Sequence, residues 1–120
     1  MRSEQKKILV VDDDPDILKV VQILLEGEGY FTQTATEAKS LDRLLSFQPD
    51  LILLDVLLSG SDGRGISKRL KSQDTTKHIP IVLMSAHVSA GQTITKSRAD
   101  DFIAKPFEIG TLLATIEKYV

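Results

Sequence analysis

The sequence feature that most constrains the fold is a run of four large aliphatic residues, Leu51 to Leu54, that leads directly into the carboxylate of Asp55. An uninterrupted apolar run of this length is typical of a strand buried on both faces, as in a parallel sheet. In open α/β sheets the ligand crevice lies outside the carboxyl ends of the strands, so Asp55 is expected at the mouth of a site. A single acid after a strand is usually a turn or cap residue, so the interpretation depends on what else reaches that edge.

Three further segments share this form, an apolar run that ends in polar residues. The runs and their polar ends are residues 8–11 with Asp12, Asp13 and Asp14, residues 79–84 with Ser85, and residues 102–104 with Lys105. Because the carboxyl ends of parallel strands meet at the same edge of a sheet, we expect these polar side chains to lie close to Asp55.

Helices are predicted between the strands. The strongest begins at Asp14 and Pro15, an N-cap followed by proline, and carries apolar residues at i, i+4, i+7 and i+8 before it stops at Gly27 or Gly29. A closing helix is predicted over residues 109–116. Weaker helices are predicted within residues 38–45, around residues 66–70 with Asp62 as cap, and within residues 86–100, and residues 57–65 are predicted to form a loop.

Strands and helices alternate along the whole chain with short connections. This pattern predicts an α/β domain with a doubly wound, five-stranded parallel sheet, the flavodoxin-like order 2-1-3-4-5, and helices on both faces. Residues 30–35 are more polar than the other runs and suit an edge strand. With no internal repeat or linker, residues 1–120 are interpreted as one domain.

Composition narrows the classes of function. The chain has 120 residues, a formal net charge of −2 and no cysteine, so a disulfide framework and a thiolate metal site are excluded and a cytoplasmic location is the default. The charges are mixed in sign, which predicts no direct contact with nucleic acid. Apolar runs of four or five residues are too short to span a membrane, and no targeting segment is recognised.

The predicted cluster at the sheet edge suggests phosphoryl chemistry. Three crowded carboxylates, Asp12, Asp13 and Asp55, repel one another, and a hard divalent cation is the usual means of keeping such a group ionised. Mg²⁺ fits best, because the chain offers oxygen ligands but no spacing of His or Cys that suits Zn²⁺ and no EF-hand loop for Ca²⁺. Lys105 could neutralise phosphoryl oxygens, and a carboxylate can act as the nucleophile and form an aspartyl phosphate.

At this point the chain resembles the receiver domain of two-component response regulators over nearly its whole length. The resemblance implies that Asp55 is the phosphoacceptor, supplied by a phosphohistidine of a sensor histidine kinase or phosphotransfer protein in a phosphorelay. It also implies that the domain catalyses only its own phosphorylation and dephosphorylation. The matching segments are residues 8–15 (ILVVDDDP), 49–55 (PDLILLD), 62–63 (DG), 84–86 (MSA) and 101–107 (DFIAKPF).

The resemblance also assigns roles to the residues around Asp55. Mg²⁺ would be bound by Asp13, Asp55 and the backbone carbonyl of Leu57, with Asp12 acting through a metal-bound water. Ser85 would donate a hydrogen bond to the phosphoryl group and Lys105 would pair with it.

Further roles concern switching and the lifetime of the phosphoryl group. Phe102 would be the aromatic switch residue on the face formed by the fourth helix, fifth strand and fifth helix. The peptide bond between Lys105 and Pro106 would be cis. Leu57 and His87 would flank the route of the attacking water, and we hypothesise that the apolar Leu57 slows hydrolysis.

Two positions depart from the family pattern. The family often has Met-Pro where this chain has Leu58 and Ser59, and a glycine is common where this chain has Arg98. The output partner and the oligomeric state, including a homodimer, are left open by the sequence.

Two other classes of protein share part of this pattern. A haloacid-dehalogenase-like phosphatase would use Asp12 as nucleophile and Asp14 as acid, but its further acidic pair is missing after the fourth strand, since Asp100 and Asp101 precede the last one. A flavodoxin-like cofactor binder would need a phosphate-cradling loop after the first strand, where three aspartates stand instead.

Overall fold

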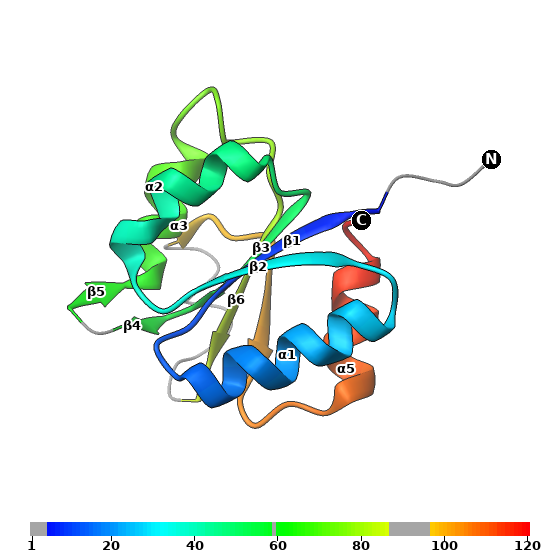
Figure 1. Cartoon of the computed structure of the whole chain (residues 1–120). Coiled ribbons are helices and arrows are strands. Elements are labelled where there is room, and N and C mark those ends of the chain that lie inside the picture. The colour runs from blue at the N-terminus through cyan, green and yellow to red at the C-terminus, as the bar shows by residue number, and fades with distance from the viewer. Residues whose placement is uncertain (1–4, 59, 87–96) are drawn as a thin grey trace.

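The computed structural model describes residues 5–58, 60–86 and 97–120. Its centre is a five-stranded parallel sheet with the order β2-β1-β3-β6-β7 (Figure 1). Taken in chain order within this sheet, that is the predicted order 2-1-3-4-5, so the flavodoxin-like topology is confirmed. The strands are β1 (Lys7–Val11), β2 (Phe31–Ala35), β3 (Leu51–Asp55), β6 (Ile81–Ser85) and β7 (Asp101–Ala104).

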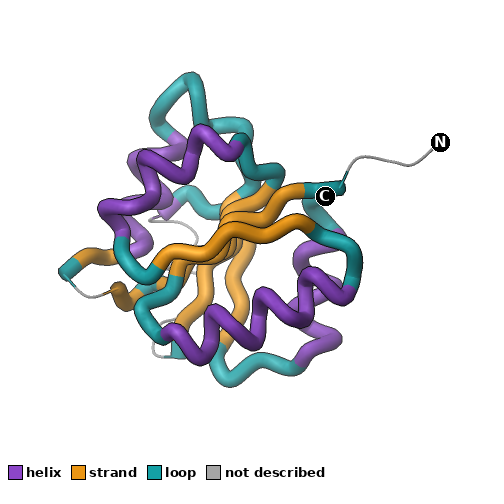
Figure 2. The backbone as a smooth tube through the Cα atoms, viewed as in Figure 1, coloured by secondary structure: helices purple, strands orange, loops and turns teal. Residues whose placement is uncertain are grey.

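Helices cover both faces of the sheet, as predicted (Figure 2). On one face lie α1 (Pro15–Gly27) and α5 (Ile109–Glu117), and on the other lie α2 (Leu41–Leu44) and α3 (Gly63–Lys71). The segment around α2 is less regular than a single helix, because the 3-10 turns η1 (Ala38–Ser40) and η2 (Leu45–Phe47) flank it. Gln48 ends this segment in the left-handed backbone region, with φ of 57°.

The aliphatic runs of the sequence are explained by two separate cores. Side chains of a strand alternate between the faces of the sheet. In β3, Leu51 and Leu53 therefore join the core beneath α1 and α5, whereas Ile52 and Leu54 join the core beneath α2 and α3. All five residues of β3 are buried. The edge strand β2 differs as expected, since Phe31 at its start is exposed.

The first helix begins as the sequence predicts. The side chain of Asp14 accepts hydrogen bonds from the backbone N–H groups of Asp16 and Ile17, and Pro15 occupies the first turn. This cap fixes the direction in which the chain leaves β1, directly after the acidic residues.

Residues 57–65 are not the simple loop that the sequence predicts. They contain β4 (Leu57–Leu58) and β5 (Ser61–Asp62), which pair antiparallel, and α3 already begins at Gly63. The predicted cap is confirmed, since the side chain of Asp62 accepts the N–H of Arg64 at 2.8 Å. The predicted helix within residues 86–100 lies largely outside the described residues. Within the described ranges, no helix combines the length and apolarity required to cross a membrane.

Candidate functional site

The acidic side chains converge at the carboxyl edge of the sheet. β1 and β3 are parallel neighbours with Val11 paired to Leu54, so the residues that follow Val11 meet Asp55 at the same edge. One carboxylate oxygen from each of Asp12, Asp13 and Asp55 lies within 4.8 Å of the others. Asp12 and Asp55 are buried, with exposed fractions of 0% and 4%, whereas Asp13 is exposed.

Lys105 follows β7 and reaches the same cluster. Its Nζ lies 2.7 Å from Oδ2 of Asp12 and 3.3 Å from Oδ2 of Asp55. Burial alone would lower the pKa of Lys105, but the hydrogen bond and charge of Asp12, with the charge of Asp55, outweigh burial and raise it. The lysine therefore stays protonated, and one ammonium group contacts two buried carboxylates.

The positive charge near Asp55 does not offset the burial of its carboxylate and the negative charge of Asp12. The pKa of Asp55 is raised, first by burial and then by the negative charge of Asp12. Lys105 and the backbone N–H of Leu57, which lies 3.3 Å from Oδ1, lower the pKa but do not compensate. A set of carboxylate oxygens with an excess of negative charge fits a hard divalent cation, which prefers oxygen ligands and relieves the repulsion.

The remaining predicted residues occupy different places around the cluster. Ser85 ends β6, is buried, and accepts the backbone N–H of Lys105 at its carbonyl oxygen. Phe102 lies half-buried in β7 against the core beneath α2 and α3. Leu57, two residues after Asp55, is 52% exposed. His87 lies outside the described residues. The peptide bond between Lys105 and Pro106 is cis, as expected.

One residue in contact with the backbone of Asp55 was missed from the sequence. Gly63, the first residue of α3, lies against the backbone of Asp55, and its N–H donates to the carbonyl oxygen of Val56 at 2.7 Å. The dipeptide of Asp62 and Gly63 was among the matching segments, but it was interpreted only as a helix cap in a loop.

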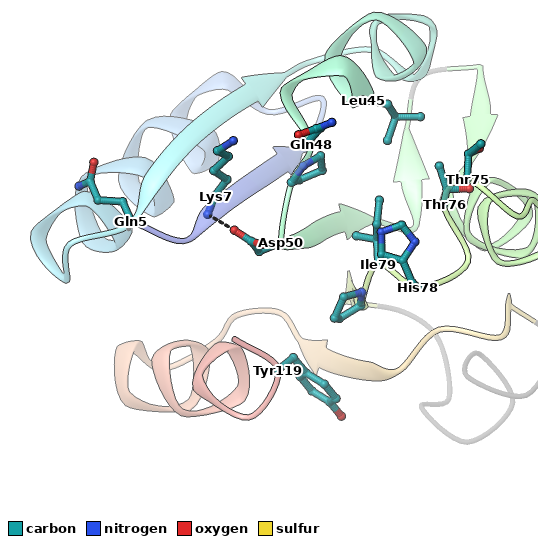
Figure 3. Close-up of a pocket in the computed structure, with 12 residues that line it drawn as sticks. Gln5, Lys7, Leu45, Gln48, Asp50, Thr75, Thr76, His78, Ile79 and Tyr119 are labelled. Carbon is teal, nitrogen blue, oxygen red and sulfur yellow. Dashed lines mark hydrogen bonds between the residues drawn. The ribbon is translucent and has the colours of Figure 1, made fainter. Parts of the chain in front are cut away.

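A cavity of about 640 Å³ lies at the opposite, amino-terminal edge of the sheet (Figure 3). Asp50 lines this cavity and accepts the backbone N–H of Lys7 at 2.8 Å, and Tyr119, near the end of the chain, lines it as well. These side chains come from the starts of β1 and β3 and from the end of the chain beyond α5, so the cavity is separated from Asp55 by the length of the sheet.

Fold and geometry define a class of protein, a flavodoxin-like α/β domain with an acidic cluster and one lysine at the carboxyl edge of its sheet. Comparison with known proteins gives the family. The model of the response regulator receiver domain matches residues 8–117, and the chain belongs to this family. It is a receiver domain of the two-component response regulator type.

Individual relatives agree with this assignment. The chain is 38% identical to the DNA-binding dual master transcriptional regulator RpaA of Synechocystis sp. over 116 residues, which cover 92% of this chain and 47% of that protein. It is 30% identical to the polar-differentiation response regulator DivK of Brucella anthropi, with 96% of each covered. The chain thus spans about half the length of RpaA and nearly all of DivK.

A solved structure agrees as well. The chemotaxis response regulator CheY4 of Vibrio cholerae superposes with a TM-score of 0.89 at 28% identity, over 98% of this chain and 100% of that chain. None of these matches is a haloacid-dehalogenase-like phosphatase.

Proposed function

We propose that Asp55 accepts a phosphoryl group from a phosphohistidine of a sensor histidine kinase or phosphotransfer protein. The observation that carries this proposal is that the two buried carboxylates, Asp12 and Asp55, differ in the length of their hydrogen bonds. Both oxygens of Asp12 accept close hydrogen bonds, from Lys105 at 2.7 Å and from the N–H of Asp14 at 2.9 Å. Asp55 has longer contacts of 3.3 Å on both oxygens and a raised pKa. The lone pairs of Asp55 are therefore less engaged in hydrogen bonds than those of Asp12, which favours Asp55 as the nucleophile.

In the proposed step an oxygen of Asp55 forms a bond to phosphorus while the bond between phosphorus and the histidine nitrogen breaks. The imidazole leaves with the bonding electron pair and is protonated by solvent. Asp13, Asp55 and the carbonyl oxygen of Leu57 would hold Mg²⁺, with Asp12 acting through a bound water. When bound, Mg²⁺ supplies the positive charge that phosphoryl oxygens need as the group is transferred.

Lys105 and Ser85 would receive the phosphoryl oxygens. Lys105 would move part of its interaction from Asp12 to the new phosphoryl group, since its ammonium already lies between the two carboxylates. Ser85 would donate its hydroxyl hydrogen to a phosphoryl oxygen. Phe102 would turn inward in response and change the face formed by the segment before β7, by β7 and by α5, as a shift between two populations.

The proposed activity is a signalling switch and not turnover of an external metabolite. RpaA, of which this chain matches less than half, is named as DNA-binding. We propose no direct contact of residues 1–120 with nucleic acid, since their net charge is −2. The partner that receives the signal is an output domain or a separate protein, and a homodimer is one form in which it could act.

Leu57 and His87 would tune the lifetime of the aspartyl phosphate. The side chain of Leu57 is half exposed next to Asp55, which fits an apolar residue that hinders an approaching water. Leu57→Asn should speed hydrolysis several-fold in a decay assay. An unchanged decay rate would remove Leu57 from this role.

The experiment that tests the proposal is the intact mass of the protein after incubation with acetyl phosphate, with and without Mg²⁺. We expect a gain of one phosphoryl group that requires Mg²⁺ and is absent in Asp55→Asn. Asp12→Asn is the matched control, because it keeps the proposed nucleophile and changes its neighbour. An adduct on Asp55→Asn, or none on the wild type, would contradict the proposal.

A further inference from the structure

The backbone that follows Asp55 is held by three elements later in the sequence: the start of α3, strand β6 and the β4–β5 hairpin. The carbonyl oxygen of Val56 accepts the N–H of Gly63 at 2.7 Å, and the N–H of Val56 donates to Met84 of β6 at 2.9 Å. The next residue, Leu57, pairs with Asp62 in the β4–β5 hairpin. The peptide units that present the Asp55 carboxylate and the Leu57 carbonyl oxygen are therefore fixed from both directions.

Gly63 makes the tightest of these contacts. A Cβ atom at this residue would overlap the carbonyl oxygen of Asp55 and would lie 3.0 Å from both the carbonyl carbon of Asp55 and Cα of Val56. All three are backbone atoms, so no flexible side chain can move aside. Any larger residue must displace either the start of α3 or the peptide that carries Asp55.

The hairpin fixes the other side of the same segment. Leu58 is 6% exposed and anchors β4 in the core, and Asp62 ends β5 while it caps α3. Arg64 holds the Asp62 carboxylate with Nη2 at 2.7 Å and Nε at 3.1 Å. Gly60 lies between β4 and β5 with φ of 74°, a backbone region that few side chains adopt. Backbone pairing thus holds this segment without the proline that the family often has here.

We propose that Gly63 is a positioning residue for phosphoryl transfer, which acts through the backbone of Asp55, and that the β4–β5 hairpin is its counterpart at Leu57. Together they would fix the distance between a carboxylate oxygen of Asp55 and the carbonyl oxygen of Leu57, the two groups that would share one cation. This inference rests on the proposed function of Asp55.

The chain offers a matched control for the test. Gly65 lies in the same turn of α3, and a Cβ built there has no heavy atom of the described residues within 4 Å apart from its chain neighbours and the backbone of its own helix. Gly63→Ala and Gly65→Ala make the same chemical change in the same helix, so only the contact with Asp55 differs. The measurements are the affinity for Mg²⁺ by isothermal titration calorimetry without a phosphodonor, and the rate of phosphorylation by acetyl phosphate as a function of Mg²⁺ concentration. Circular dichroism establishes that each variant is folded.

We expect folded Gly63→Ala to need at least tenfold more Mg²⁺ for half-maximal rate, or to react at least tenfold more slowly at saturation. Gly65→Ala should stay within twofold of the wild type. A folded Gly63→Ala that reacts like Gly65→Ala would overturn the inference while leaving the proposed function intact. If the wild type itself takes no phosphoryl group, the proposed function fails first.

A second pair of variants decides the matter if Gly63→Ala does not fold. Gly60 is exposed, so substitutions there should be tolerated by the core. Gly60→Asn can adopt a positive φ and should keep the wild-type response to Mg²⁺, whereas the β-branched Gly60→Val should shift it several-fold. Equal responses of these two variants, with Gly63→Ala unfolded, would overturn the inference.

Discussion

Both edges of the sheet hold carboxylates paired with a lysine, but the paired carboxylates of the carboxyl edge are buried, whereas Asp100 at the amino-terminal edge is exposed. At the carboxyl edge one ammonium group, that of Lys105, contacts the carboxylates of Asp12 and Asp55. At the amino-terminal edge the carboxylate of Asp100 meets the ammonium of Lys71 at 2.6 Å and the backbone N–H of Ile81 at 2.8 Å. The cluster at the carboxyl edge has more negative charge than its contacts neutralise, whereas the pair of Lys71 and Asp100 has one cation for one anion.

The amino-terminal edge shows what a structural ion pair in this fold looks like. Lys71 also donates to the carbonyl oxygen of Ile79 at 2.8 Å, so it joins the end of α3 to the segment before β6. Asp100 in turn leads into β7, and its own N–H donates to the carbonyl oxygen of Ile81. The charges of Lys71 and Asp100 are thus neutralised by each other and by backbone groups of the fold. Under the proposed function, the excess of negative charge at the carboxyl edge would be neutralised by a cation when the phosphoryl group is transferred.

The largest effect on stability is expected at the balanced edge. Lys71→Met should lower the free energy of unfolding by about 1–2 kcal/mol, because the carbonyl oxygen of Ile79 loses a charged donor and the exposed Asp100 loses its cation. Urea denaturation measures this, with phosphorylation by acetyl phosphate expected within twofold of the wild type. Unchanged stability would mean that the two edges do not differ in the way described.

At the carboxyl edge, removing a charge should increase stability instead of lowering it. Asp55→Asn should raise the free energy of unfolding at pH 7 by about 1 kcal/mol, because it removes a buried charge that repels Asp12. The pKa of Asp55 is raised in the folded state, so its ionisation weakens the fold as pH rises above the ordinary value of 3.8. The advantage of Asn should therefore vanish below that pH and grow as pH rises through the folded pKa.

Asp101→Asn provides the control for this pH dependence. Burial would raise the pKa of Asp101, but Lys118, the N–H of Phe102 and the hydroxyl of Tyr119 outweigh burial and lower it. Its charge therefore stabilises the fold above the ordinary value of 3.8, and that contribution is lost as pH falls through the folded pKa. Denaturation series from pH 3 to pH 7 should show the two variants diverging in opposite directions. Parallel curves would contradict the contrast.

A further prediction concerns an uncharged polar group between the two edges, the hydroxyl of Ser67. The hydroxyl of Ser67 in α3 is fully buried and has no hydrogen-bond partner within the described part of the chain. Ser67→Ala should raise the free energy of unfolding by about 1 kcal/mol. The control is Thr76→Val, since the hydroxyl of Thr76 donates to the carbonyl oxygen of Leu70 at 2.6 Å and its removal should be destabilising. A loss of stability in Ser67→Ala would show that its hydroxyl is satisfied after all.

The smallest effect concerns the backbone before Asp100. Arg98 has φ of 60°, a left-handed conformation that costs a residue with a side chain more than glycine. Arg98→Gly should raise the free energy of unfolding by about 0.5–1 kcal/mol, and thermal unfolding measures it. Gln48→Gly, at φ of 57° on another segment, should give a similar gain. Destabilisation at Arg98 alone would point to a contact of its side chain that outweighs the strain.

The sequence predicts the strands and the carboxyl edge well because both depend on local patterns. Buried runs such as residues 51–54 identify their strands, and parallel topology then brings Asp12, Asp55 and Lys105 together. The β4–β5 hairpin was missed because two-residue strands have no periodicity that a pattern can reveal. The link between Lys71 and Asp100 was also missed, because two charged residues far apart in sequence give no sign that they will meet.

Arg98, which stands where the family commonly has glycine, shows how the sequence pattern and the structure complement each other. The resemblance noted a glycine where this chain has arginine, and the positive φ of Arg98 supplies the physical reason for the glycine. Gly63 is the converse case, since its dipeptide matched the family but the reason, close approach to Asp55, appears only in three dimensions.

The most direct test of the central claim is to locate the phosphoryl group. After phosphorylation with acetyl phosphate and Mg²⁺, reduction with borohydride converts an aspartyl phosphate into homoserine, and peptide mass spectrometry identifies the position. We predict homoserine at residue 55 and unmodified aspartate at residues 12 and 13. Homoserine at residue 12 would instead favour the phosphatase-like chemistry, and it would contradict the claim that the excess charge at the carboxyl edge serves Asp55 as the phosphoacceptor.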